Sequence, residues 1–211
     1  MLLTAAALGA VALCSTTANA DTFTLGGNQT AVRGSLTIAS LTNGQIVFSF
    51  ANATPNSLSS RLTGIGFDLP TNGPFSLTNS PVGTNFTFST NPGNVPQFNG
   101  ANLDFAEITG NNIAGGNPPS GLANGVSSGN FTVTGNFAGL SQQTIAQNTY
   151  IRFQAIDSNP SSDVANGIIT ISGSPVPEPS EWLAMGMAAT SVGGLMIRAR
   201  RRKGTRETLA A

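Results

Sequence analysis

Residues 45–50 read Gln-Ile-Val-Phe-Ser-Phe and carry large apolar side chains at every second position. Successive side chains of a β-strand point to opposite faces of the sheet. Ile46, Phe48 and Phe50 therefore share one face, and the residues between them share the other. The segment is predicted to be a half-buried strand whose aromatic face turns toward a core.

Several other short stretches show the same alternation. They are residues 35–39, 85–88, 131–134, 151–155 and 169–171, and the strand predicted around Leu103, Phe105 and Ile108 joins them. Glycine, asparagine and proline, which are turn residues, separate these stretches, and no sustained 3.6-residue period appears between them. This pattern predicts an all-β fold, an antiparallel two-sheet β-sandwich of the jelly-roll or immunoglobulin-like kind, over residues 21–174.

The twelve phenylalanines all fall within that predicted domain and supply the apolar surface for its core. Between residues 91 and 129 apolar residues are sparse. Residues 111–125 are predicted to form a long surface loop.

The amino end has an apolar run over residues 2–13, followed by the triplet Ala18-Asn19-Ala20. A small residue at Ala18 and Ala20 after such a run predicts a signal peptide, residues 1–20, that is cut after Ala20. A buried amino-terminal helix is the alternative. The single cysteine, Cys14, lies inside this segment, so the exported chain would have no disulfide and would depend on burial alone for stability.

Charge is distributed unevenly along the chain. There are nine basic and nine acidic residues in all, and six of the basic ones lie in the last fourteen positions. The predicted domain itself carries more acidic than basic residues. Because such a surface cannot neutralise a run of phosphates, nucleic acid is not expected as a partner.

Residues that could perform catalysis are scarce. The chain has no histidine, its cysteine lies in the predicted signal peptide, and its lysine, Lys203, lies near the carboxyl end. Only carboxylate chemistry remains, and Asp104 and Glu107 are the nearest acidic pair. Three residues apart on a strand, they are expected on opposite faces as solvated surface acids. A non-enzymatic protein without cofactors is therefore predicted.

The segment from Asp157 to Asp163 offers oxygen ligands at Asp157, Asn159 and Asp163 that a calcium ion could use. It lacks the central glycine and terminal glutamate of an EF-hand loop. A turn in which these side chains cap their own backbone explains the same residues, so no metal site is assigned.

The carboxyl end contains three consecutive elements. A proline cluster begins at Pro175, residues 182–197 are uncharged and start at Trp182, and a basic cluster follows. The basic cluster consists of Arg198, Arg200, Arg201, Arg202 and Lys203. As a helix, sixteen residues span about 24 Å, slightly less than the hydrocarbon core of a bilayer. A single transmembrane helix with the basic cluster on the cytoplasmic side is predicted. The alternative is a buried helix with a solvated basic end.

Val-Pro-Glu-Pro-Ser at residues 176–180, the short apolar stretch and the arginine cluster together resemble the PEP-CTERM sorting signal of exported bacterial proteins, in a form similar to cyanobacterial members. The resemblance covers about 30 of the 211 residues, within the predicted sorting tail at 175–211. It implies recognition of Pro177, Glu178 and Pro179 by exosortase, a membrane-embedded processing enzyme, with the basic cluster as the stop signal. The tail after Lys203 is longer than the usual ending. Exopolysaccharide is the further partner that the resemblance suggests.

These observations predict an exported, non-enzymatic cell-surface or extracellular-matrix protein, anchored in the membrane by its tail and then processed. Two alternatives remain open: a surface carbohydrate-binding module and a secreted hydrolase that uses carboxylates. The low content of tryptophan and tyrosine does not favour a stacking site for sugars.

Overall fold

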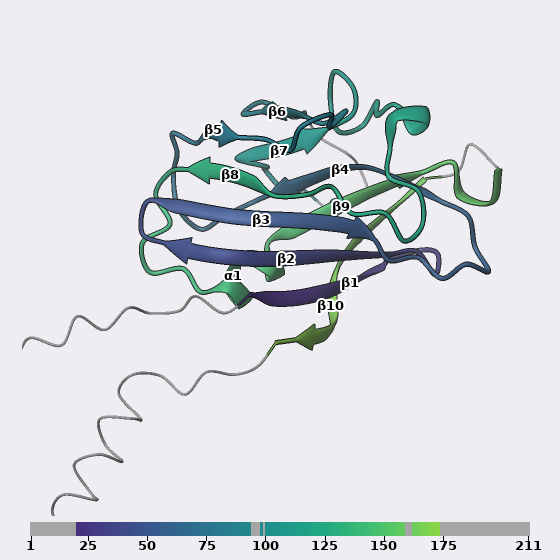
Figure 1. Cartoon of the computed structure of the whole chain (residues 1–211), viewed down its shortest axis with the longest axis horizontal. Coiled ribbons are helices and arrows are strands. Elements are labelled where there is room, and N and C mark those ends of the chain that lie inside the picture. The colour runs from purple at the N-terminus through teal and green to yellow at the C-terminus, as the bar shows by residue number, and fades with distance from the viewer. Residues whose placement is uncertain (1–19, 94–97, 99, 159–161, 174–211) are drawn as a thin grey trace, which may run out of the picture. The chain divides into compact units, whose positions relative to one another are not determined.

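The computed structural model describes residues 20–93, 98, 100–158 and 162–173, which form ten strands and one short helix (Figure 1). The strands are β1 (Asp21–Gly27), β2 (Arg33–Thr42), β3 (Gln45–Asn52), β4 (Arg61–Phe67), β5 (Ser76–Asn79), β6 (Thr87–Ser89), β7 (Phe105–Ile108), β8 (Phe131–Thr134), β9 (Thr149–Gln154) and β10 (Ser162–Ser172). The helix is α1 (Gln142–Gln147), and 3₁₀ turns cover Pro118–Ser120 and Ile156–Ser158. The predicted all-β, antiparallel class is confirmed.

The strands form one sheet in the order β5-β8-β3-β2-β1-β10-β9-β4-β7-β6, and every pairing is antiparallel. The prediction of two separate sheets, jelly-roll or immunoglobulin-like, is therefore wrong. The single sheet curls over so that β3 and β4, which are distant in the strand order, share one buried core.

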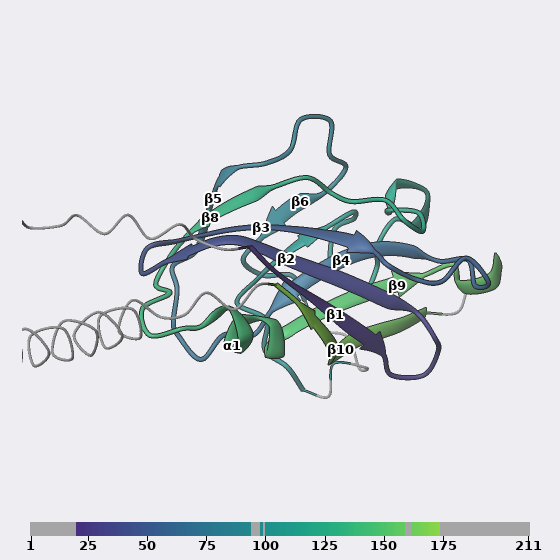
Figure 2. The ribbon, with the colours of Figure 1, turned by 60° about the horizontal axis from the view of Figure 1, so that its bottom comes forward.

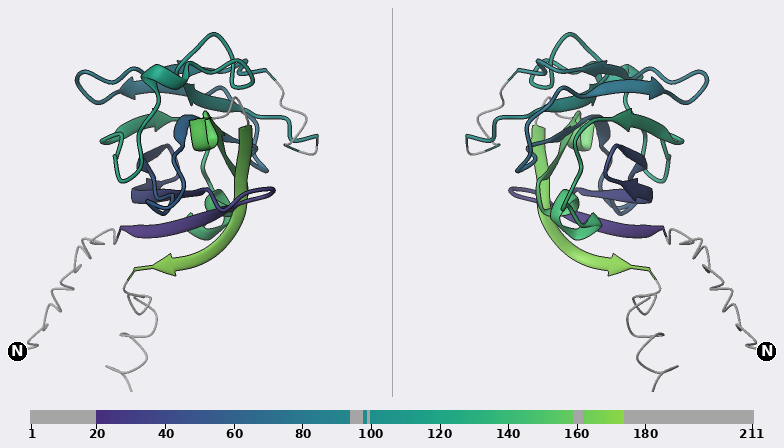
Figure 3. Two further views of the ribbon diagram at one scale, coloured as in Figure 1. Left: turned by 90° about the vertical axis from the view of Figure 1, so that its right-hand side faces the viewer. Right: turned by 90° about the vertical axis from the view of Figure 1, so that its left-hand side faces the viewer.

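The curl depends on β10, the long bent strand in Figures 2 and 3. Its first part, Ser162–Ala165, pairs with β9, and its second part pairs with β1. The register shifts twice against β1, leaving Asn166 and Ile169 without a paired residue. Such bulges bend a strand and let it pass from one layer to the next. A period-two sequence pattern does not show that one strand pairs first with β9 and then with β1.

The inner face of the sheet carries the main core. Ten of the twelve phenylalanines are buried in this core, and Phe88 is partly buried against it. Phe48 lies at the centre, with its ring centroid 5.1 Å from that of Phe67 and 5.7 Å from that of Phe131. The aromatic face predicted at residues 46–50 therefore faces the core.

A second cluster lies on the outer face of β4 and β7. Phe98, Leu103 and Ile113, which come from the connecting segments, pack there with Ala106 and Ile108 of β7 and with Val164 of β10. The approach is close because Gly66 of β4 has no side chain: a Cβ there would lie 2.6 Å from Leu103 Cδ1. The predicted surface loop at 111–125 is thus in part a packed cover, since Ile113 is only 1% exposed.

The alternation at residues 169–171 does not mark a buried strand face. Ile169 is 46% exposed and Ile171 is 53% exposed. Among the described residues no helix is long and apolar enough to cross a membrane. The predicted transmembrane helix, 182–197, lies outside the described residues.

Candidate functional site

Glu107 differs most from its predicted environment. It lies on β7 opposite Ile65 of β4 and Phe88 of β6, and its side chain is fully buried. Neither carboxyl oxygen has a hydrogen-bond partner within the described parts of the chain. Burial raises the pKa of Glu107 to about 8, so the group is mostly neutral at pH 7. The prediction of a solvated surface acid is wrong for this residue.

Asp104 is held elsewhere, just before β7. Its Oδ2 accepts a hydrogen bond from Leu69 N (2.7 Å). Burial raises the pKa of Asp104, and the carboxylate of Asp68 adds to this, while the bond from Leu69 opposes it. Asp104 is partly exposed and Glu107 is enclosed, so the two acids do not form an open pair.

The two described acids of the predicted calcium loop are engaged by backbone groups. Asp157 Oδ1 accepts a hydrogen bond from Ser59 N (3.1 Å). Asp163 is buried, and its carboxylate accepts bonds from Gln29 N, Thr30 N and the Thr30 hydroxyl. The third predicted ligand, Asn159, lies outside the described residues. The described acids therefore act as anchors for turns.

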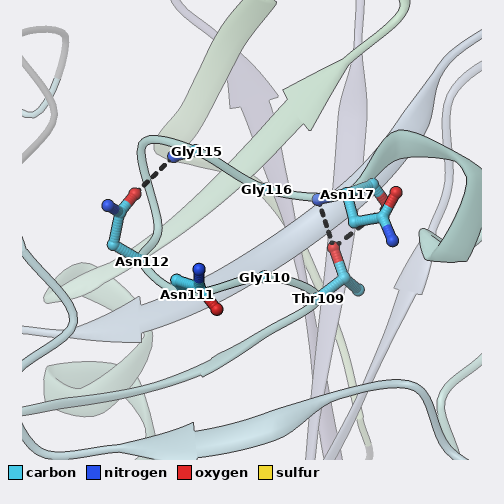
Figure 4. Close-up of a pocket in the computed structure, with 7 residues that line it drawn as sticks. All are labelled: Thr109, Gly110, Asn111, Asn112, Gly115, Gly116 and Asn117. Atoms are coloured by element: carbon cyan, nitrogen blue, oxygen red, sulfur yellow. Dashed lines mark hydrogen bonds between the residues drawn. The ribbon is translucent and has the colours of Figure 1, made fainter.

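A pocket of about 460 Å³ opens in the loop between β7 and β8 (Figure 4). It is lined by Thr109, Gly110, Asn111, Asn112, Gly115, Gly116 and Asn117. The loop runs outward through Asn111 and returns through Gly116. Hydrogen bonds hold both ends: Gly115 N donates to Asn112 Oδ1, and Asn117 N donates to Thr109 Oγ1 (3.0 Å).

The loop is fixed to the sheet beneath it. Thr109 Oγ1 donates to Thr63 O of β4 (3.1 Å). Thr63 is the residue left unpaired where the register of β4 and β9 shifts. Gly116 permits the close contact, because a Cβ there would collide with Gln154 Oε1 and lie 2.9 Å from Thr63 Oγ1.

Two buried polar atoms lie directly behind Gly116. Thr63 Oγ1 and Gln154 Oε1 have no hydrogen-bond partner among the described residues. Arg152, which precedes Gln154 by two residues on β9, is buried and donates a hydrogen bond from Nη2 to Ser162 Oγ (2.9 Å). Burial lowers the pKa of Arg152, and the neighbouring Asp163 opposes that change.

The pocket itself is lined only by neutral groups: amides, one hydroxyl and the backbone. It can exchange hydrogen bonds with a ligand but has no side chain that titrates near neutral pH. Tyr150, the single tyrosine, packs against Phe98 with the ring centroids 5.1 Å apart. Its ring is therefore packed against the outer cluster.

Sequence patterns did not single out this pocket. The run Thr-Gly-Asn-Asn-Ile-Ala-Gly-Gly-Asn at residues 109–117 resembles an ordinary polar loop. The buried Ile113 in its middle was the available signal that the loop is packed. The sorting residues Pro177, Glu178 and Pro179, the basic cluster and Ala18 all lie outside the described residues.

Comparisons with known proteins return nothing: no family model, no curated protein and no solved structure matches this chain.

Proposed function

We propose that this chain is an exported, non-catalytic cell-surface or extracellular-matrix protein, associated with exopolysaccharide, that is sorted and processed through its carboxyl-terminal tail. The observation that carries the proposal is the order of the tail: Pro177-Glu178-Pro179, then an apolar stretch at 182–197, then the basic cluster. Each element alone is common. Together they provide a recognition sequence, a membrane helix and a group of charges that resists transfer across the bilayer.

The ends of the folded unit support this arrangement. β1 begins at Asp21, directly after Ala20, and β10 ends at Ser172, shortly before Pro175. Thr22 and Ser172 are paired residues of neighbouring strands. Cleavage after Ala20 and in the tail would therefore leave the sheet intact.

The orientation follows from charge. The basic cluster stays on the cytoplasmic side of the membrane, so the β-domain lies outside. An exosortase-type enzyme then acts on the tail near Glu178 and releases the domain to the surface or the matrix.

The predicted pair Asp104 and Glu107 gives the hydrolase alternative no support. Glycoside hydrolysis needs two carboxyl groups on either side of a substrate. Asp104 is bonded to the backbone of Leu69, while Glu107 lies enclosed in the phenylalanine core. A substrate would have to enter that core to reach Glu107.

The test is the mass and the fractionation of the exported protein in its natural host. Glu178→Gln removes the charge within Pro-Glu-Pro without changing the size of the side chain. We expect the full-length form to accumulate in the membrane. The matched control is Glu181→Gln, which removes a neighbouring charge outside the motif and should leave processing unchanged.

A second variant tests anchoring. Replacing the basic cluster by serine should let uncut protein pass to the exterior, because the charge that stops transfer is lost. If Glu178→Gln and this variant both gave the processed mass of the wild type, the tail would not be a sorting signal.

A further inference from the structure

We propose that the pocket formed by residues 109–117 binds a neutral, hydroxyl-rich ligand, such as a sugar unit of a polysaccharide chain. The proposal deepens the proposed function, on which it rests for the source of the ligand outside the cell. Binding itself is measured in vitro and does not depend on sorting. The inference combines the lining of the pocket, the groups left for a ligand and the rigidity of the loop.

The lining determines the class of ligand. All seven residues are neutral. Charged side chains are the stronger partners for phosphate, sulfate and calcium, and the pocket supplies neither a cation nor a carboxylate. A sugar hydroxyl needs neither, because it donates to carbonyl oxygens and accepts from amide nitrogens. The volume of about 460 Å³ is within the usual range for small-molecule sites, about 300–1,000 Å³.

The side chains of Asn111 and Asn112 supply the contacts. Both are exposed, and Figure 4 shows the Asn111 side chain on the outgoing run of the loop, with Gly115 and Gly116 on the returning run. The side-chain oxygen of Asn112, Oδ1, already accepts a hydrogen bond from Gly115 N, which leaves its side-chain nitrogen, Nδ2, as a donor. An amide that presents one donor and one acceptor side by side fits two adjacent hydroxyls.

The loop is held in place before any ligand arrives. Thr109 ties its base to β4, Gly116 N donates to Asn112 O (3.2 Å), and Ile113 anchors its tip in the outer cluster. A preformed loop reduces the entropy cost of binding.

The interaction with one sugar unit should be weak, because no aromatic ring lines the pocket for stacking. Many copies on a surface would bind a polymer more strongly through multivalency. This favours a polysaccharide over a free monosaccharide as the ligand.

The test uses the purified full-length chain in detergent and saturation-transfer NMR with two hexasaccharides, cellohexaose and maltohexaose. We expect transfer to at least one of them. Asn111→Ala and Asn112→Ala should each weaken binding. The dissociation constant from a titration of the transfer signal should rise by about five-fold for the loss of one hydrogen bond. Asn130→Ala, which alters an exposed asparagine outside the pocket, is the matched control and should bind like the wild type.

Absence of transfer to both sugars, or equal transfer in the wild type and the two pocket variants, would overturn the proposal. Saturable binding of calcium chloride or sodium sulfate that Asn111→Ala abolishes would also overturn it, by showing a charged ligand instead. Because Asn111→Ala leaves the tail untouched, its processing should match the wild type. The binding test and the sorting test can therefore fail separately.

Discussion

The two faces of β4 and β7 are built by different means. On the inner face, Phe67 and Phe105 stack with their ring centroids 4.7 Å apart inside the main core. On the outer face, Gly66 and Ala106 present almost no side chain, and Leu103 and Ile113 of the connecting segments fill the space above them. The inner face therefore depends on large residues in the strands, and the outer face depends on small residues in the strands and apolar residues in the loops.

The largest effect should come from the inner face. Phe48→Ala removes a fully buried ring that contacts Phe50, Phe67 and Phe131. We expect a loss of about 3–5 kcal/mol in the free energy of unfolding, because the cavity cannot collapse among the other rings. Denaturant melts measure this. A loss below about 1 kcal/mol would show that the curled sheet does not enclose this ring.

The inner face was predictable where a strand, such as β3, carries its own period-two pattern. Ile46, Phe48 and Phe50 are buried as that pattern requires. The connection of the layers was not predictable, since it depends on the bulges at Asn166 and Ile169 of β10. A bulge is a property of the pairing between two strands, and neither strand alone displays it.

The second effect concerns Glu107, a buried acid on the inner face. The pKa of Glu107 is about 8 in the fold, against 4.5 for an ordinary glutamic acid. The folded state therefore binds more protons between these values, so its stability falls as the pH rises from about 4.5 to about 8 and levels off above 8. Between pH 6 and pH 9 we expect a loss on the order of 2–3 kcal/mol in the free energy of unfolding.

Glu107→Gln is the control for this prediction, because its side chain cannot ionise. Its free energy of unfolding should be nearly constant between pH 6 and pH 9. The chain has no histidine, so no imidazole titrates in the same window. Equal pH dependence in the wild type and the variant would mean that Glu107 reaches water or a partner in the folded protein.

The third effect tests the outer face. Ile113→Ala truncates a side chain that is 1% exposed in the cluster above Gly66. We expect the free energy of unfolding to fall by about 2 kcal/mol. This is the lower end of the range for truncating a buried isoleucine, because the loop can move toward the sheet and partly fill the cavity. Hydrogen exchange should show the loss confined to residues near the loop. A uniform increase in exchange across β2 and β3 would mean that both faces unfold as one unit.

The pocket was harder to predict than either face. Its residues are those of any polar loop, and its shape depends on Gly116 lying against Thr63 of β4 and Gln154 of β9, which are distant from Gly116 in the sequence. The position of Glu107 was also missed, because an acid between apolar residues on a short strand gives no sign of which face the sheet will bury. Both features depend on tertiary contacts rather than on local pattern.

The smallest effect should come from a segment that resembles the inner-face strands in sequence. Ile169 and Ile171 alternate with Thr170 as Ile46 and Phe48 alternate with Val47, yet Ile169 is 46% exposed and Ile46 is fully buried. Ile169→Ala should cost less than about 1 kcal/mol, whereas Ile46→Ala should cost at least about 2 kcal/mol. The same substitution at both positions holds the removed atoms constant, so the difference reports burial alone. Equal losses in denaturant melts would show that Ile169 is covered in solution, and the second part of β10 would then belong to the core that its pattern suggests.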